Sequence, residues 1–161
     1  MVPETWKRGM GITILLLLIV SAAGCFGGTP PDFRNETEKY DLAVQQYNNA
    51  KTLYHQGNYS VAKTEFSAVI KHFQDNKSVF ETISKGNYTS KEVYLSKKLV
   101  NNADQYTYAA AFYRDVADAA ARGDTKQAYA IELNAEEFDQ ASRLTYEDIR
   151  NELLPYLHSR K

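Results

Sequence analysis

The spacing of the apolar residues between positions 90 and 154 constrains this chain more than any other feature, because it alternates between steps of three and four. Such spacing places the apolar side chains on one face of an α-helix, which repeats every 3.6 residues. Thr89 and Glu92 have the separation of a capping box, in which each side chain bonds a backbone group at the helix start. We therefore expect a long helix from about Ser90 to Arg122.

A second long helix is expected directly after the first. Gly123 ends the first helix, and Asp124 together with Gln127 can cap the next one. The second helix should continue to about Leu154, because Pro155 has no backbone N–H with which to extend it.

The apolar faces of these two helices match each other. The first helix presents Leu95, Leu99, Asn102, Tyr106, Ala109, Tyr113, Val116 and Ala120, and the second presents Ala128, Ile131, Ala135, Phe138, Ser142, Thr145, Ile149 and Leu153. The two sets pair in reverse order, with large side chains opposite small ones and Asn102 opposite Thr145. This matching predicts an antiparallel hairpin about Gly123, with a hydrogen bond between the two polar residues.

A shorter helical hairpin is expected upstream. Apolar residues follow helical spacing over 40–54 and again over 59–73, and Gly57 between them can adopt the left-handed conformation that ends a helix. The stretch 74–90 is less regular, and we expect it to hold a separate short helix over 78–85. No strand-like alternation competes with these patterns, so the predicted fold class is all-α.

The turn of this first hairpin resembles a tetratricopeptide repeat. Residues of the types found in that repeat stand at Ala50, Leu53, Gly57, Tyr59, Ala62 and Phe66. The resemblance covers roughly residues 40–73 and implies two closely packed helices with a groove for a partner polypeptide. A hairpin that simply packs well is the alternative interpretation, and no clean second copy follows. The predicted architecture is thus a tetratricopeptide-like helical hairpin followed by a long antiparallel helical hairpin.

The first 25 residues have the order of an export signal. Lys7 and Arg8 precede an apolar run over 11–20, and small residues lead to Cys25, the one cysteine of the chain. The uncharged stretch is shorter than the roughly 20 residues that a membrane-spanning helix needs. Its end resembles the lipobox of secreted lipoproteins, with Ala22 where that motif prefers leucine.

This resemblance implies that residues 1–24 are a signal peptide and that Cys25 is the lipidation site. The protein would then be held by lipid at the extracytoplasmic face of the cell membrane or envelope. Plain secretion and an uncleaved N-terminal anchor helix are the alternatives. Residues 25–36, which contain glycines and prolines, are expected to form a flexible linker, and residues 37–161 a single all-helical domain.

Four Asn-X-Ser/Thr sequons are N-glycosylation candidates: Asn35, Asn58, Asn76 and Asn87. All four are expected at turns or helix ends, where an exported protein can carry an oligosaccharide. The alternative is that these residues serve only as turn and cap residues. Because such glycosylation is common on archaeal surfaces, an archaeal origin fits the sequence.

Other short motifs favour structural roles over chemistry. The tripeptide Arg122-Gly123-Asp124 is one that integrins bind, but each of its residues also suits a turn between two helices. The adjacent carboxylates Glu136 and Glu137 diverge on a helix instead of converging as a catalytic pair. No metal-binding spacing links the three histidines, which are His55, His72 and His158.

Composition and motifs together favour a binding function over a catalytic one. Removal of residues 1–24 leaves a net charge of about −2, which argues against a nucleic-acid partner. The sequence has no nucleophile motif, phosphate-binding loop or redox cysteine pair, so we expect neither an enzyme nor a cofactor. Of the 12 tyrosines, several have core spacing, whereas four can serve as surface contacts. These four are Tyr88, Tyr94, Tyr108 and Tyr129.

The predicted function is that of a membrane-anchored lipoprotein acting as a protein-interaction or envelope-assembly module, with a protein or peptide partner. The alternative is an extracytoplasmic ligand-sensing or solute-binding helical bundle. An open, aromatic-lined groove would favour a polypeptide, and a closed apolar cavity with convergent polar groups would favour a small ligand.

Overall fold

The computed structural model describes residues 29–160, which form four α-helices and no strand. The helices are α2 (Phe33–His55), α3 (Tyr59–Lys85), α4 (Ser90–Ala121) and α5 (Thr125–His158). The all-α class is therefore confirmed. The expected signal peptide and Cys25 lie outside the described residues.

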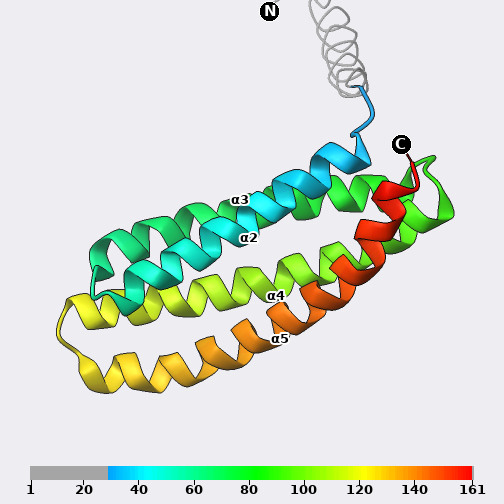
Figure 1. Ribbon diagram of the computed structural model, residues 1–161. Coiled ribbons are helices and arrows are strands. Elements are labelled where there is room, and N and C mark those ends of the chain that lie inside the picture. Colours follow the sequence, from blue (N-terminus) through cyan, green and yellow to red (C-terminus); the bar gives the residue numbers. More distant parts are fainter. Residues whose placement is uncertain (1–28, 161) are drawn as a thin grey trace, which may run out of the picture. The chain divides into compact units, whose positions relative to one another are not determined.

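Consecutive helices run antiparallel and pack along their lengths (Figure 1). Helix α3 packs on both α2 and α4, and α4 packs on α5, whereas the backbones of α2 and α5 stay farther apart. The α2–α3 and α4–α5 turns lie at one end of the bundle, and the α3–α4 loop lies at the other. Two helical hairpins thus form one bundle, in which the backbones of α2 and α5 are not closely packed against each other.

Each helix forms because its buried residues keep a single face. In α3 the buried positions alternate steps of four and three throughout: Ala62, Phe66, Val69, Phe73, Asn76, Phe80 and Ile83. This is the repeat of helices that pack side by side with a small crossing angle. Two of the three phenylalanines of this face stack on tyrosines of α4, with ring centroids 5.5 Å apart for Phe66 and Tyr113 and 4.8 Å for Phe73 and Tyr106.

The predicted turns and caps are confirmed. Gly57 and Gly123 have φ of +80° and +75°, the left-handed conformation in which a β-carbon would be strained. Thr89 and Glu92 form a capping box at the start of α4. The Asp124 carboxylate accepts a hydrogen bond of 3.0 Å from the backbone N–H of Gln127 at the start of α5.

Helix α3 is continuous, so the prediction of a separate helix over 78–85 is wrong. The buried face of α3 continues through the stretch whose apolar spacing is irregular, because Phe73, Asn76 and Phe80 all remain buried. The polar member of this set is accommodated within the helix, where Asn76 Nδ2 donates to the carbonyl of His72 at 2.8 Å.

Helix α5 passes through Pro155 and ends at His158, three residues beyond it, so the expected end at Leu154 is also wrong. Pro155 is exposed, and water can therefore bond the carbonyl that the proline leaves unpaired. Beyond it, Tyr156 and Leu157 still pack against the core and hold the last turn in place.

Helix α2 begins at Phe33, so residues 33–36 of the expected linker are helical. The Phe33 ring is buried and lies 6.3 Å from Phe80 and 6.2 Å from Tyr156, measured between ring centroids. The Asp32 carboxylate caps this helix start by accepting from a backbone N–H. One aromatic anchor and one cap thus extend the helix beyond the region of regular apolar spacing.

The long antiparallel hairpin of α4 and α5 is present, and one detail of its predicted seam needs correction. Asn102 does not bond Thr145. Its Nδ2 donates to the Ser142 carbonyl at 2.8 Å, and its Oδ1 accepts from the Tyr40 hydroxyl at 2.8 Å. The pairing changes because Tyr40 of α2 also reaches this point, so three helices meet at Asn102.

The tetratricopeptide likeness of the first hairpin is not confirmed. Helices α2 and α3 have 23 and 27 residues, so this hairpin is longer than a 34-residue repeat. Ala62 and Phe66 are fully buried at the hairpin interface.

Candidate functional site

A cleft lined by polar and charged side chains lies between α2 and α5. We call it the α2–α5 cleft. It has a volume of about 280 Å³ and is lined by Val44, Asn48, Lys51, Tyr106, Asp139, Arg143, Tyr146, Glu147 and Arg150. The cleft exists because the backbones of α2 and α5 stay apart while α4 closes its base.

Two tyrosine rings, Tyr106 and Tyr146, lie at the floor of the cleft. Tyr106 of α4 lies 5.2 Å from Tyr47 of α2 and 6.2 Å from Tyr146 of α5, measured between ring centroids. All three side chains are buried, and Tyr106 stacks below on Phe73. Of these three rings, Tyr106 and Tyr146 reach the cleft lining, with exposed fractions of 2% and 6%.

Carboxylates of α5 bind side chains of α2 across the cleft. Asp139 accepts from the Tyr47 hydroxyl at 2.9 Å and pairs with Lys51 Nζ at 2.5 Å. Farther along, Glu132 accepts from the Tyr54 hydroxyl at 2.7 Å. In the other direction Asp41 of α2 accepts from Tyr146 of α5. The two helices are therefore joined by side-chain hydrogen bonds where the backbones do not meet.

The hydroxyls of the tyrosines that lie between α2 and α5 remain protonated. Burial raises the pKa of Tyr47, and the negative charge and hydrogen bond of Asp139 raise it further. Burial likewise raises the pKa of Tyr146, with the hydrogen bond to Asp41 as the next cause. Burial also raises the pKa of Tyr106. These groups can donate hydrogen bonds, but they cannot act as bases near neutral pH.

The rim of the cleft carries charges of both signs. Arg150 lies over the Tyr146 ring, 5.9 Å from its centroid. Within residues 29–160, Arg143 and Glu147 have no oppositely charged group within 4 Å. Both side chains are exposed. Among the described residues Arg150 has no ion pair either, so the rim offers two guanidiniums and one carboxylate whose charges are not already neutralised.

A second hollow, the α2–α3 groove, lies on another face of α2. It has a volume of about 340 Å³ and is lined by Glu36, Lys39, Leu42, Ala43, Gln46, His72, Asp75, Asn76 and Val79. Leu42 within it is 55% exposed. Most of its exposed lining surface is apolar, in contrast to the hydrogen-bonded α2–α5 cleft.

The structure separates the four predicted glycosylation candidates into two kinds. Asn35, Asn58 and Asn87 are exposed and lie at the start of α2, before α3 and in the α3–α4 loop. Asn76 was also expected at a turn, but it lies within α3 and is only 7% exposed. The continuity of α3 accounts for this difference.

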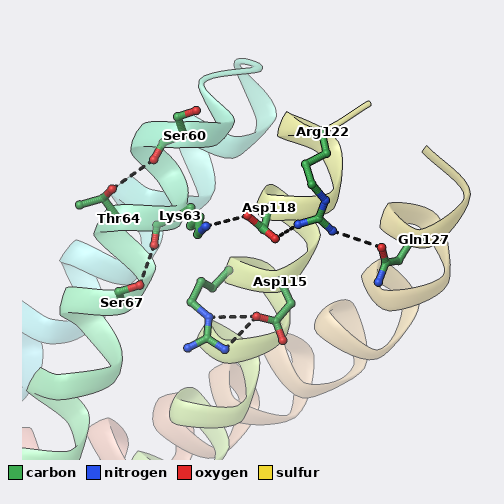
Figure 2. A network of polar contacts seen from close by, with 9 residues as sticks. Ser60, Lys63, Thr64, Ser67, Asp115, Asp118, Arg122 and Gln127 are labelled. Atoms are coloured by element: carbon green, nitrogen blue, oxygen red, sulfur yellow. Dashed lines mark hydrogen bonds and ion pairs between the residues drawn. The ribbon is translucent and has the colours of Figure 1, made fainter. Parts of the chain in front are cut away.

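The residues of the Arg122-Gly123-Asp124 tripeptide are engaged in the turn between α4 and α5. Figure 2 shows Lys63 of α3 pairing with Asp118 of α4 at 2.6 Å, and Arg122 binding both Asp118 and Gln127. Asp124 caps α5. These contacts give the charged residues structural partners.

The predicted surface tyrosines differ in their exposure. Tyr94, Tyr108 and Tyr129 are exposed, and Tyr108 rests 5.6 Å from the ring centroid of Phe138. Tyr88 is only partly exposed, because its hydroxyl donates to the Pro31 carbonyl at 2.8 Å. None of the four lines the α2–α5 cleft.

The remaining sequence candidates do not gather into a site. Glu136 and Glu137 are both exposed. His72 shares a hydrogen bond of 2.5 Å with Gln46. Over residues 29–160, no group of three or more histidine, cysteine, aspartate or glutamate side chains could hold a metal ion. In the same range, no helix has the combination of length and apolar character required to cross a bilayer.

Sequence reasoning missed the polar contacts between α2 and α5, above all those of Asp139, Lys51 and Glu132. Asp139 and Glu132 each follow a residue of the predicted α5 seam directly, next to Phe138 and Ile131. Acidic residues at the edge of an apolar seam are a weak signal of a polar contact with a third helix. Only the placement of α2 reveals that tyrosines lie opposite.

Comparisons with protein families, curated proteins and solved structures found no match to this chain.

Proposed function

We propose that this protein is a lipid-anchored, extracytoplasmic lipoprotein whose helical bundle binds a protein or peptide partner, as an interaction or envelope-assembly module. The lipobox-like sequence at Cys25 supports the anchor, and the α2–α5 cleft supports the binding role. The partner would enter this cleft.

The observation that carries the binding role is an open cleft with a tyrosine floor and a rim of both charges. Tyrosine offers a large contact area at a low cost in conformational entropy, which suits polypeptide recognition. The polar and charged side chains of the cleft walls supply most of its contact surface, and the two tyrosine rings lie beneath them. Arg143 and Glu147 can each bind a complementary charge on the partner and so set its orientation.

The cleft also has room for a small polar ligand, because Lys51, Arg143 and Arg150 converge on it. This feature favours the alternative function, a ligand-sensing or solute-binding bundle. A polypeptide is the better fit because the cleft lies open along two helices and is not an enclosed apolar chamber.

Site-specific photo-crosslinking in intact cells tests the proposal. A photoreactive amino acid would replace Asn48 or Arg143 in the cleft, and Glu65 or Lys97 on other exposed surfaces as matched controls. We expect the same polypeptide adduct from both cleft positions and not from the controls. Equal adducts at all four positions, or none at any, would contradict binding in the cleft.

A charge-reversal variant separates the two functions. Arg143→Glu should weaken the cleft-specific adduct at Asn48, whereas Lys97→Glu should leave it unchanged. A small molecule retained by the purified protein in native mass spectrometry, without any polypeptide adduct, would support the ligand-binding alternative instead.

A further inference from the structure

We propose that Asn35, Asn58 and Asn87 carry N-linked oligosaccharides, that Asn76 does not, and that the sugar on Asn35 covers the α2–α3 groove. This inference rests on the export that the proposed function includes. It assigns modification sites and identifies which face of the bundle remains free for a partner.

The three assigned side chains are accessible. Asn58 is exposed before α3 and makes no side-chain cap hydrogen bond. Asn87 is exposed in the four-residue loop that joins α3 to α4. Asn35 is exposed on the first turn of α2, where the cap uses only its backbone N–H, bonded to Asp32 at 2.9 Å. Each amide nitrogen can therefore be modified without the loss of a contact within the fold.

Asn76 has the same tripeptide pattern but not the same accessibility. Its Nδ2 donates to the His72 carbonyl at 2.8 Å, and the residue is 7% exposed at the base of the α2–α3 groove. A sugar on this nitrogen would have to emerge through the α2–α3 groove, past the side chains that line it. Its attachment would displace the buried amide from its hydrogen bond to the His72 carbonyl.

The modification reaction requires a free amide nitrogen. The donor is an oligosaccharide linked to a polyprenyl phosphate or diphosphate. The Asn nitrogen forms a bond to the first sugar carbon and loses one proton, the bond from that carbon to the phosphate oxygen breaks, and the lipid phosphate leaves with the electron pair. An amide bonded inside a helix, as at Asn76, is not available for this step.

The helical position of Asn35 determines which groove its sugar covers. At about 100° per residue, Asn35 lies within about 20° of Leu42 around the axis of α2 and roughly 180° from Val44. It therefore stands above the α2–α3 groove, about two turns or 10 Å from Leu42, and on the opposite face from the α2–α5 cleft. A sugar chain there shields the exposed Leu42 side chain and leaves the cleft open.

Glycopeptide mass spectrometry tests the assignment. The full chain with its own signal would be produced in an archaeal host that N-glycosylates exported proteins, with a resident glycoprotein as the control for the host reaction. We expect occupancy at Asn35, Asn58 and Asn87 and none at Asn76, with Asn76→Gln leaving the pattern unchanged. Two results would overturn the proposal. One is sugar on Asn76 in the folded protein, and the other is an exported protein in which none of the other three asparagines carries sugar.

Export is measured separately, by the accessibility of the protein to protease added outside intact cells. Accessible but unmodified protein would reject glycosylation and leave the proposed function standing. Inaccessible protein would reject both.

Thiol labelling tests the shielding of the groove. Leu42→Cys and, as a matched control, Asn48→Cys each add a thiol to a chain whose one natural cysteine would carry lipid. We expect a bulky maleimide to label position 42 at least several-fold more slowly than position 48, and Asn35→Gln to remove the difference. Equal labelling rates in the glycosylated protein would show that the sugar does not cover the groove.

Discussion

Aromatic residues determine how closely the helices approach each other, and Phe66 shows this most clearly. Its ring is fully buried, stacks on Tyr113 of α4 and lies 6.0 Å from the Tyr47 ring of α2. Three helices therefore depend on one side chain. Loss of such a ring removes apolar burial and leaves a cavity that a packed core can only partly refill.

We expect Phe66→Ala to lower the free energy of unfolding by roughly 3–5 kcal/mol. Urea titration followed by circular dichroism would measure it. The matched control is Val61→Ala on the same helix, where the side chain is 52% exposed and the change should be small. An unchanged midpoint for Phe66→Ala would mean that this ring is outside the core.

Asn102 acts as a polar junction of three helices. It is fully buried, and it binds the Tyr40 hydroxyl of α2 and the Ser142 carbonyl of α5. Asn102→Leu would leave the Tyr40 hydroxyl without a partner in the core, and the Ser142 carbonyl with only its bond within α5. We expect a loss of about 1–3 kcal/mol in stability, because an unpaired buried polar group bears its full desolvation penalty.

The neighbouring exposed residue provides the control for Asn102. Asn101→Leu changes the same side chain on the same turn but should have little effect in the same urea titration. If the two variants unfold alike, the junction does not contribute to stability.

At the scale of helices and turns, the two left-handed glycines define where the hairpins reverse. A β-carbon at Gly57 meets no atom within 4 Å, so the cost of a substitution there comes from backbone conformation alone. We expect Gly57→Ala to destabilise the protein by about 1–2 kcal/mol. Gly57→Asn should cost less, because asparagine tolerates this conformation better. Thermal unfolding would measure both, and equal melting temperatures for Gly57→Ala and the parent would contradict the assignment.

A cluster of charges joins α4 to α5 near the end of the hairpin. Glu152 pairs with Lys91 at 2.5 Å and with Lys98 at 2.6 Å. The hydrogen bond from Lys91, followed by that from Lys98, lowers the pKa of Glu152 from 4.5 to about 2. A carboxyl group whose pKa is lower in the folded state stabilises the fold above its ordinary pKa and loses that contribution as pH falls.

We therefore expect stability to decrease as pH falls from 4.5 towards 2, with part of this decrease due to Glu152. Glu152→Gln should flatten that part of the profile, whereas Glu137→Gln, at an exposed position, should leave it intact. Added salt should weaken the effect, because the pairs are partly exposed. Identical pH profiles for Glu152→Gln and the parent would exclude this contribution.

Elements determined by local chemistry were predictable from the sequence. The capping box at Thr89 and the turns at Gly57 and Gly123 depend on a few neighbouring residues, and the helical hairpins follow from apolar spacing. The uninterrupted course of α3 was missed because a buried Asn76 breaks the apolar pattern without breaking the helix. The helix beyond Pro155 was missed because packing of Tyr156 and Leu157 outweighs the local effect of the proline.

The α2–α5 cleft could not be predicted in the same way. Its floor and walls come from positions 44–51, 106 and 139–150, which only the packing of four helices brings together. Nothing in the spacing of α5 indicates that Asp139 meets Tyr47. The candidate site is thus a property of the tertiary arrangement, whereas the anchor and the glycosylation candidates are read from short motifs.

At the scale of the whole molecule, the proposed lipid on Cys25 determines where the protein is located. We expect Cys25→Ser to move the protein from the membrane fraction to the soluble fraction or to leave an uncleaved precursor. A lipid anchor of two chains binds the membrane stably, and the variant has no thiol to which such an anchor could be attached. Cell fractionation and intact-mass measurement would test this. An unmodified cysteine in the purified membrane form would reject the lipid anchor.

The arrangement of the chain ends also determines how the bundle responds to force. Helix α2 begins and α5 ends at the same end of the bundle, opposite the turns at Gly57 and Gly123 (Figure 1). A pull on Pro31 against a partner held near those turns loads α2 along its axis, so the bonds from Tyr47, Lys51 and Tyr54 share the load in shear. A pull between the two chain ends would instead peel α2 from α5 one contact at a time. The protein should therefore be mechanically strong in the first direction and weak in the second.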